Sequence, residues 1–432
     1  MSPEIAGIAG IVILVLLLLA RMWIGLSMAM VGFLGIIFLK GIDGAFGILG
    51  TVPYKYVAFY PMSAIPLFIF MAMVISNTGI GASLFKTAHT WLGQFRGGLA
   101  MASVMASGGL AAIMGDSVAE VVTMSQIAVP EMKKYNYETK LASGSVAAGG
   151  TLGILIPPSL GFILYGILTE QSIGALFMAG ILPGILLTLL FMATILIITT
   201  LNPSAGPRGP KTGFKEKVVS LKGTWHMLLL FVLIIGGIYG GIFTPTEAGA
   251  VGAFGAIVIS AISRRLTLKI LLESLLEATK ITAMIMLLVM GAFILMKFLA
   301  LSKLPFLLAD TISGLMLPSF FVFMGIIVLY IFLGMFLDIF AAIVLTIPVI
   351  FPLVMKMGYD PIWFGVIMVL VMEMGLITPP VGLNVFALAG VTQIPLHTIF
   401  RGVLPFVLAM IVCIILLLLF PQIALFLPGL MQ

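Results

Sequence analysis

Two short stretches of the chain decide its fold: TLGILIPPS at residues 151–159 and GLITPPVGLN at residues 375–384. Each interrupts a long apolar run with a Pro-Pro pair, Pro157-Pro158 in the first and Pro379-Pro380 in the second. Two consecutive prolines remove two backbone donors and clash with the preceding helical turn. Inside a membrane, unwound backbone is tolerated only where protein, water or ions satisfy its amides and carbonyls. The two stretches therefore predict helices that unwind within a membrane.

The composition of the whole chain supports this interpretation. Of its 432 residues, 62% are apolar and only 8% are charged, whereas a soluble domain carries about 25% charged residues. This excludes soluble enzymes, disordered proteins and nucleic-acid-binding proteins. The apolar runs long enough to serve as membrane spans cover residues 5–20, 22–39, 64–78, 142–168, 173–201, 225–242, 248–262, 282–300, 363–391 and 403–420. We expect no cleavable signal peptide, because the first run lacks a basic front end.

The two Pro-Pro stretches belong to an internal repeat. Adding 222 to positions in the first half recovers the second half without a gap. The paired positions include Asp116 and Asp338, Pro130 and Pro352, Lys134 and Lys356, Gly153 and Gly375, and Pro183 and Pro405. Four apolar runs lie between the two broken ones, so the second unit runs opposite to the first. The pattern predicts an inverted repeat, as in many secondary transporters; a channel could share it, but paired broken helices favour a midplane binding site.

The distribution of basic residues predicts the topology. Lys86 and Arg96 precede the apolar stretch 98–130, and Lys133, Lys134 and Lys140 follow it. Basic loops favour the cytoplasm, so this stretch must enter and leave on one side as a re-entrant hairpin. Both termini then fall outside.

Residues 267–280 combine a leucine face with a charged face and predict an interfacial helix that braces the protein; a lipid-binding regulatory helix is the alternative.

We therefore expect an all-α polytopic membrane protein with two re-entrant hairpins and two unwound transmembrane helices. Residues 1–97 form scaffold helices. The first unit covers 98–200, with its hairpin at 98–130 and its broken helix at 141–170. A basic cytoplasmic linker, further scaffold helices and the interfacial arm occupy 201–317. The second unit covers 318–432, with its hairpin at 318–352 and its broken helix at 362–391.

The hairpin tips carry acidic residues, Asp116 in the first and Asp338 in the second. A charged side chain in the membrane costs about 2.5–3.5 kcal/mol even on the insertion scale, so each is a functional candidate. They could bind a cation, cap a helix or carry a proton. Glu120 and Glu373 are secondary candidates. The sequence contains no metalloprotease motif, P-loop or nucleophile elbow.

Four segments together resemble one known family. They are IAVPEMKK at 127–134, AGGTLGILIPPS at 148–159, TPTEA at 244–248 and MEMGLITPPVGLN at 372–384. In this order they are similar to the large membrane (M) subunit, or DctM component, of tripartite ATP-independent periplasmic (TRAP) transporters, along nearly the whole chain. The resemblance implies an elevator-type secondary transporter of the bacterial inner membrane, driven by a Na⁺ gradient and using no other cofactor. It also implies two partners, a small four-helix membrane subunit and a periplasmic binding protein that delivers a small organic anion such as a C4-dicarboxylate, sugar acid or sialic acid.

The resemblance also implies site residues. In this family the hairpin tips and unwound helices hold the ion and the substrate. Carried onto this chain, the candidates are Gly115, Asp116, Ser117, Thr151, Gly153, Pro157, Pro158, Gly334, Asp338, Gly375, Thr378, Pro379 and Asn384. The expected Na⁺ positions lie near Gly115, Ser117, Thr151 and Gly153, and near Gly334, Asp338, Gly375 and Thr378.

One position departs from the family pattern. The first hairpin tip usually carries a hydroxyl where this chain has Asp116, in Met114-Gly115-Asp116-Ser117. We expect Asp116 to alter the ion site, by strengthening cation binding or by adding a protonatable group. Two rival functions remain open: a stand-alone ion or anion exchanger of the same architecture, and an intramembrane enzyme that uses Asp116 or Asp338. The enzyme is disfavoured by the repeat and by the absence of a nucleophile or metal set.

Overall fold

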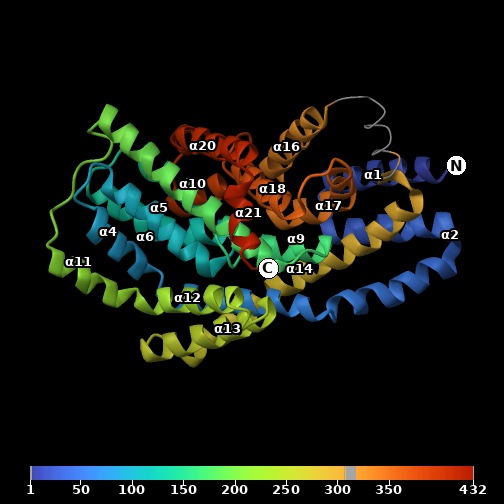
Figure 1. The fold of residues 1–432 in the computed structure, drawn as a ribbon, viewed down its shortest axis with the longest axis horizontal. Coiled ribbons are helices and arrows are strands. Elements are labelled where there is room, and N and C mark those ends of the chain that lie inside the picture. Colours follow the sequence, from blue (N-terminus) through green and yellow to red (C-terminus); the bar gives the residue numbers. More distant parts are fainter. Residues whose placement is uncertain (1, 306, 308–317, 432) are drawn as a thin grey trace.

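The structure, a computed structural model, describes residues 2–305, 307 and 318–431, and each element in that part of the chain is a helix (Figure 1). Within the described residues, 9 helices are long and apolar enough to cross a membrane. The prediction of an all-α polytopic membrane protein is confirmed.

The N-terminal helices up to residue 77 pack along α14 (Leu268–Ser302) and α13 (Pro245–Ile262), and the last helix of this part packs mainly against α5 (Gly98–Met114). Its elements are α1 (Pro3–Leu19), α2 (Ile24–Val57), the short η1 (Tyr60–Ser63), α3 (Ala64–Asn77) and α4 (Ala82–Leu92). α2 is two helices joined at Gly41, whose φ of 80° leaves the helical region. Gly25 and Gly32 on α2 place their backbone directly against α14. Glycine is needed at both positions, because a Cβ would collide with the facing main chain.

The first repeat unit contains a hairpin, a broken helix and a long helix. Its elements are α5 (Gly98–Met114), α6 (Ser117–Lys134), α7 (Thr139–Gly150), α8 (Leu152–Leu155), α9 (Leu160–Thr169) and α10 (Ile173–Leu201). The second unit has the single helix α18 (Pro361–Leu376) where the first has α7 and α8, and it otherwise follows the same order: α16 (Ser319–Phe336), α17 (Ile339–Lys356), α19 (Leu383–Thr392), α20 (Leu396–Leu419) and the added α21 (Gln422–Gly429). Adding 222 to the bounds of α6 gives those of α17.

The segment between the units begins with the basic linker. Its elements are α11 (Phe214–Ser220), η2 (Leu221–Gly223), α12 (Trp225–Tyr239), α13 (Pro245–Ile262) and α14 (Leu268–Ser302). A capping box formed by Thr244 and Glu247 begins α13. The structure joins the predicted arm at 267–280 to the following apolar run in the single helix α14, which Thr267 caps by accepting a hydrogen bond from the Ile270 amide. The end of this predicted domain, residues 308–317, lies outside the described residues.

The broken helices form the centre of the molecule. α7 from Leu141 onward, α8, α9 and the part of α18 from Trp363 onward are buried. The two hairpins lie on opposite sides of this centre, α5 and α6 at the left of Figure 1 and α16 and α17 toward the right. The units also interlock, because α7 crosses α20 where Gly144 and Gly402 bring the two backbones together. The two breaks therefore lie inside the protein, between the hairpins.

Candidate ion and substrate site

The first hairpin turns at Gly115 and Asp116. Gly115 has a φ of 59°, the left-handed conformation that glycine adopts without strain. A Cβ on it would lie 3.0 Å from the Pro158 carbonyl oxygen, so the tip rests on the break of its own unit. The Asp116 carboxylate accepts a hydrogen bond of 2.7 Å from the Ala119 amide and thereby caps α6. One of the predicted roles of Asp116, helix capping, is present in the structure.

The second hairpin tip repeats this arrangement with one difference. Asp338 caps α17 by accepting a 3.0 Å hydrogen bond from the Ala341 amide. Gly334 packs its backbone against α18, where a Cβ would lie 3.3 Å from Gly375 Cα. The Gly382 amide donates to the Met335 carbonyl at 3.2 Å, which ties this tip to its break. The helix before the tip ends at Leu337 in extended backbone, whereas a left-handed glycine ends the first.

The two breaks differ in exposure. Pro157 and Pro158 are buried, whereas Pro379 and Pro380 are exposed. The hydroxyls of the two break threonines already donate to helix carbonyls, Thr151 to Ala148 at 2.7 Å and Thr378 to Met374 at 2.6 Å. Their oxygens can therefore offer only lone pairs to a ligand. That is the role expected of a cation ligand.

The hairpin of the first unit meets the broken helix of the second at a buried polar cluster. We define it as Ser117 and Glu120 from α6, Glu373 from α18 and Asn384 from α19. The Ser117 hydroxyl lies within hydrogen-bond distance of a Glu373 oxygen and, at 2.8 Å, of the Gly150 carbonyl oxygen. The Asn384 amide donates to the Ser117 oxygen at 3.4 Å. All four side chains have at most 1% of their surface exposed.

Several oxygens in this cluster are unsatisfied. In the described part of the chain, both carboxylate oxygens of Glu120, Glu373 Oε1 and Asn384 Oδ1 have no hydrogen-bond partner. The Glu120 carboxylate lies beside Gly153, where a Cβ would be only 2.8 Å from Oε2. Burying an ionised carboxylate without a partner is very costly, so a cation or a proton is required to offset its charge. These oxygens are hard ligands of the kind that bind Na⁺.

No basic side chain supplies that compensation. The ion pairs that join one described residue to another are Lys134 with Glu131, Lys140 with Glu138 and Lys269 with Glu273, all away from the cluster. The segments 98–130, 141–170, 318–352 and 362–391 contain no Lys, Arg or His at all. Among the described residues, no three or more His, Cys, Asp or Glu side chains meet in a geometry that would hold a metal ion. A cation here would therefore depend on a mixed set of carboxylate, amide, hydroxyl and carbonyl oxygens.

The structure brings the site residues predicted from the sequence together in two groups, one at each hairpin tip and break. Gly115, Asp116, Ser117, Thr151, Gly153, Pro157 and Pro158 meet around the first tip and break, and Gly334, Asp338, Gly375, Thr378 and Pro379 around the second. The sequence places Asn384 in the second half, but its side chain reaches Ser117 of the first. Glu120 and Glu373, secondary candidates from the sequence, lie where the two halves join. The ligand roles of all these residues stay predictions.

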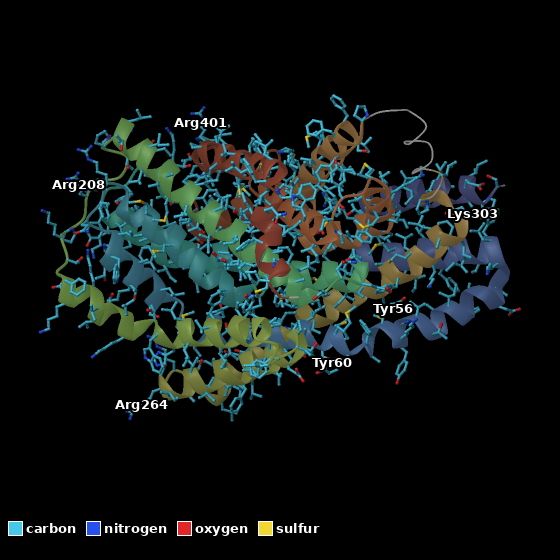
Figure 2. The ribbon with its side chains drawn as sticks, in the orientation of Figure 1. Tyr56, Tyr60, Arg208, Arg264, Lys303 and Arg401 are labelled. Atoms are coloured by element: carbon cyan, nitrogen blue, oxygen red, sulfur yellow. The ribbon has the colours of Figure 1, made fainter. Side chains whose placement is uncertain are left out.

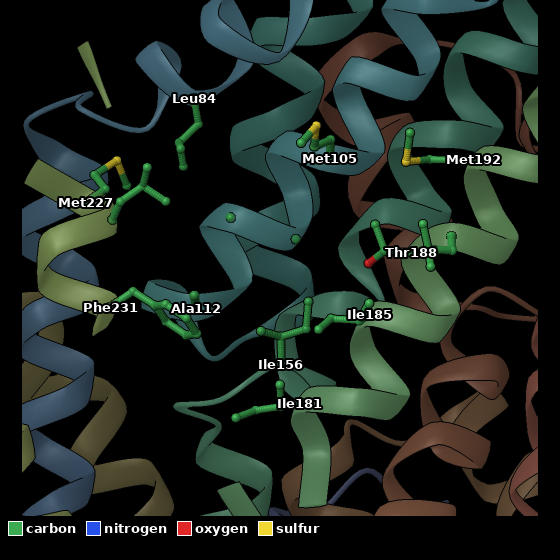
Figure 3. A pocket seen from close by; sticks show the side chains of 14 residues that line it. Leu84, Met105, Ala112, Ile156, Ile181, Ile185, Thr188, Met192, Met227 and Phe231 are labelled. Atoms are coloured by element: carbon green, nitrogen blue, oxygen red, sulfur yellow. The ribbon is translucent and has the colours of Figure 1, made fainter. Parts of the chain in front are cut away.

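A separate cavity of about 370 Å³ lies behind the first break (Figure 3). Side chains such as Met105, Ile185, Met192 and Phe231 give it apolar walls, and its only side-chain hydroxyl, on Thr188, donates to the Gly184 carbonyl. Ile156, within the first break, forms part of the wall. This cavity offers no group that would bind an anion, so the polar cluster and the tips remain the candidate site.

Comparisons with known proteins show what the chain is similar to. Residues 11–423 match the family model described as "Tripartite ATP-independent periplasmic transporter, DctM component". The chain is 37% identical to a C4-dicarboxylate TRAP transporter large permease protein of Pseudomonas aeruginosa, over 86% of each chain. It is 34% identical to a sialic acid TRAP transporter large permease protein of Vibrio cholerae, over 86% of this chain and 87% of the relative.

A solved structure shares the fold at lower sequence identity. The Alcanivorax borkumensis YdaH transporter, whose structure is described as having an unusual topology, superposes with a TM-score of 0.63 at 15% identity. The match covers 89% of this chain and 90% of that one. At this identity the likeness concerns the fold alone.

Proposed function

Because the chain belongs to the DctM-component family of TRAP transporters, we propose that it is the transport subunit of a sodium-coupled importer of small organic anions. Membership makes it a large permease of the bacterial inner membrane and a transporter subunit rather than an enzyme. Its substrate class is that of its relatives, whose names include C4-dicarboxylate and sialic acid. The partners are a small membrane subunit and a periplasmic binding protein.

The observation that carries sodium coupling is the set of unsatisfied oxygens in the buried polar cluster. An organic anion that binds between the hairpin tips meets Asp116, Asp338, Glu120 and Glu373, and the tip and break segments contain no basic side chain. Like charges at close range repel strongly in a low-dielectric interior. A bound cation removes this repulsion, so the anion binds well only when the ion is present. This mutual dependence is the thermodynamic basis of symport.

The proposed ion positions follow the repeat. One Na⁺ is held near Gly115, Ser117, Thr151 and Gly153, with the Glu120 carboxylate beside Gly153. A second is held near Gly334, Asp338, Gly375 and Thr378. Helix N-termini and backbone amides at the breaks then face the anion. The two units would move as one body against a scaffold that includes α2, α3, α13 and α14, the arrangement called an elevator.

The test is uptake into proteoliposomes that contain the chain with its small membrane subunit. Radiolabelled succinate and sialic acid serve as probes, each with and without its binding protein, under an imposed Na⁺ gradient. We expect uptake of one probe that requires both the inward Na⁺ gradient and the binding protein. Uptake that continues without Na⁺ would reject sodium coupling. Uptake that is unchanged without the binding protein would favour the stand-alone exchanger.

A further inference from the structure

A second polar cavity lies at the base of the first hairpin, far from the candidate transport site. It has a volume of about 430 Å³ and opens where the linker after α10 passes the loop before α5. Three basic side chains line it, Arg96 from the loop and Arg208 and Lys211 from the linker. Arg208 lies at the far left of Figure 2, at the opposite end of the molecule from Lys303.

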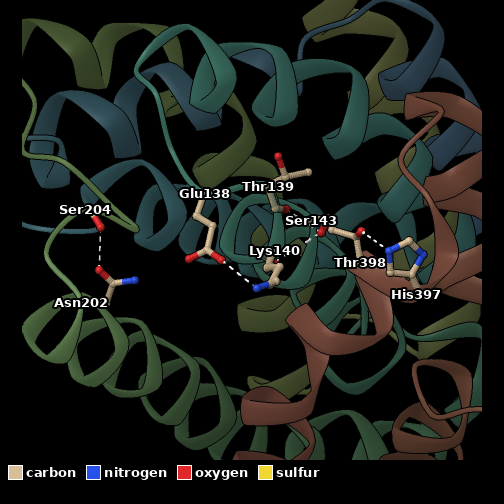
Figure 4. A network of polar contacts seen from close by, with 8 residues as sticks. All are labelled: Glu138, Thr139, Lys140, Ser143, Asn202, Ser204, His397 and Thr398. Atoms are coloured by element: carbon tan, nitrogen blue, oxygen red, sulfur yellow. Dashed lines mark hydrogen bonds and ion pairs between the residues drawn. The ribbon is translucent and has the colours of Figure 1, made fainter.

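The positive charge of this cavity is uncompensated. Arg96, Arg208 and Lys211 form no ion pair with the described residues, and no acidic side chain lines the cavity. Nearby Lys140, in contrast, pairs with Glu138 at 3.2 Å (Figure 4). Three like charges around one cavity repel each other, and an anion between them converts the repulsion into charge-assisted hydrogen bonds. Arginine in particular binds phosphate oxygens in a bidentate manner.

The frame that carries these cations is fixed by the backbone. Beside Arg96, the Gly97 amide donates to the Gly206 carbonyl at 2.9 Å. Beside Arg208, the Gly209 amide donates to the Gly93 carbonyl at 2.8 Å. Gly97 has a φ of 68°, and a Cβ there would lie 2.7 Å from an Ile195 side-chain atom. The linker is therefore held against both the hairpin base and α10. The backbone that carries the three basic side chains is thus already in position before a ligand binds.

One wall of the cavity continues into an apolar surface. Leu196 and Phe95 line the cavity and are 44% and 47% exposed. Further along the same end of α10, Ile197 and Leu201 are 61% and 82% exposed. α10 is one of the helices long and apolar enough to cross a membrane. A ligand that fits both parts carries a phosphate and an acyl chain.

We propose that this cavity binds the headgroup of an anionic phospholipid from the cytoplasmic leaflet, with its acyl chains along the exposed face of α10. Basic pockets on the cytoplasmic side of membrane proteins recognise such headgroups. Each basic residue near the membrane surface strengthens the binding of an anionic lipid by about the same factor. The lipid holds the linker, the hairpin base and α10 together at one point. This site is independent of the proposed ion and substrate site.

Native mass spectrometry of the purified full chain tests the proposal. The protein in detergent is titrated with phosphatidylglycerol and, separately, with phosphatidylcholine that has the same acyl chains. We expect saturable binding of phosphatidylglycerol alone. Binding weakens about fivefold for each basic residue removed, so the combined variant Arg96→Gln, Arg208→Gln and Lys211→Gln loses about 100-fold. Equal binding of the two lipids, or full binding by this variant, would overturn the proposal.

The matched control is the double variant Lys86→Gln and Lys215→Gln. These lysines line a neighbouring cavity of about 500 Å³ that also contains Glu216. We expect the control to bind phosphatidylglycerol as the wild type does; an equal loss would mean nonspecific attraction and would overturn the proposal. If the combined variant does not fold, the single exposed variant Arg208→Gln supplies the test through its fivefold loss. Displacement of the lipid by millimolar inorganic phosphate would identify a soluble-anion site instead.

Discussion

At the scale of single residues, Glu120 is the side chain whose environment is hardest to explain without a ligand. Its two carboxylate oxygens are buried and unpartnered, one of them against Gly153. We expect Glu120→Gln to fold normally, because a neutral amide is less costly to bury. Its apparent affinity for Na⁺ in uptake assays should fall at least about tenfold, a change of about 1.4 kcal/mol.

The control for this prediction lies on the same helix. Glu131 pairs with Lys134 at 3.7 Å on the surface of α6, so Glu131→Gln should leave the Na⁺ dependence unchanged. A Glu120→Gln variant with wild-type Na⁺ dependence would show that this carboxyl group is not an ion ligand. Uptake by the wild type that never depended on Na⁺ would instead reject sodium coupling as a whole, so the two failures are distinguishable.

Substitutions at Asp116 distinguish its role as a helix cap from a role in ion binding. Its carboxylate accepts from the Ala119 amide, a role that serine can take over at the start of α6. We expect Asp116→Ser to keep the thermal stability of the wild type and to change the Na⁺ or pH dependence of transport, whereas Asp116→Ala loses about 1 kcal/mol of stability with the cap. Unfolding curves and Na⁺ and pH titrations of uptake measure the two effects. A fully active Asp116→Ser variant with unchanged dependences would leave Asp116 as a cap only.

At the scale of elements, the contact between the second hairpin and its broken helix depends on glycine. Gly334 lies on α16 with its backbone against Met372 and Gly375 of α18. We expect Gly334→Ala to cost about 1–3 kcal/mol of stability through overpacking, and to reduce uptake. Gly325 on the same helix has nothing within 4 Å of a Cβ, so Gly325→Ala should be neutral or stabilising by about 0.5–1 kcal/mol. Equal melting temperatures for the two variants would contradict the close packing.

The contact between α4 and the end of α6 should depend on pH. The His89 ring meets the Tyr135 ring edge-on with centroids 5.9 Å apart, and partial burial lowers the pKa of His89 below its usual value. Near pH 6.5 the unfolded chain therefore binds a proton at this histidine, whereas the folded chain does not. Stability is therefore full above this pH and falls as the pH drops from about 6.5 toward the folded pKa. Melting curves at pH 7.5 and 5.5 should show a smaller loss for His89→Gln than for the wild type.

Much of the element structure was predictable because it depends on local chemistry. The repeat of 222 residues places the ends of α17 at the residues that correspond to the ends of α6, and in both hairpins an aspartate begins the second helix. The positions of prolines alone predict helix ends less well, because Pro130 and Pro352 lie inside α6 and α17 without ending them. The meeting of Asn384 and Glu373 with Ser117 depends on how α19 packs against α6, and no sequence pattern encodes that tertiary contact.

At the scale of the whole molecule, the two units have the same order of elements but are not in the same state. The prolines of the first break are buried, whereas those of the second are exposed. Unwound backbone cannot face hydrocarbon, so the exposed break must face water or a protein partner. We expect this unequal exposure to reflect alternating access, in which each conformation opens the proposed site to one side of the membrane. The other conformation should reverse it.

Ser159 and Val381 are equivalent under the repeat and measure this reversal. Ser159 is fully buried, and Val381, next to the exposed Pro380, is partly exposed. The chain has one cysteine, the buried Cys413, so a Cys413→Ser background leaves each introduced thiol alone. Without Na⁺ or substrate, we expect a membrane-impermeant maleimide to label Val381→Cys at least tenfold faster than Ser159→Cys. A saturating mixture of Na⁺ and substrate, which drives the transport cycle, should bring the two labelling rates closer together. The reason is that the first break then becomes accessible for part of the time. Labelling rates that remain fixed in every condition, in a variant that still transports, would exclude a reversal of exposure between the two breaks.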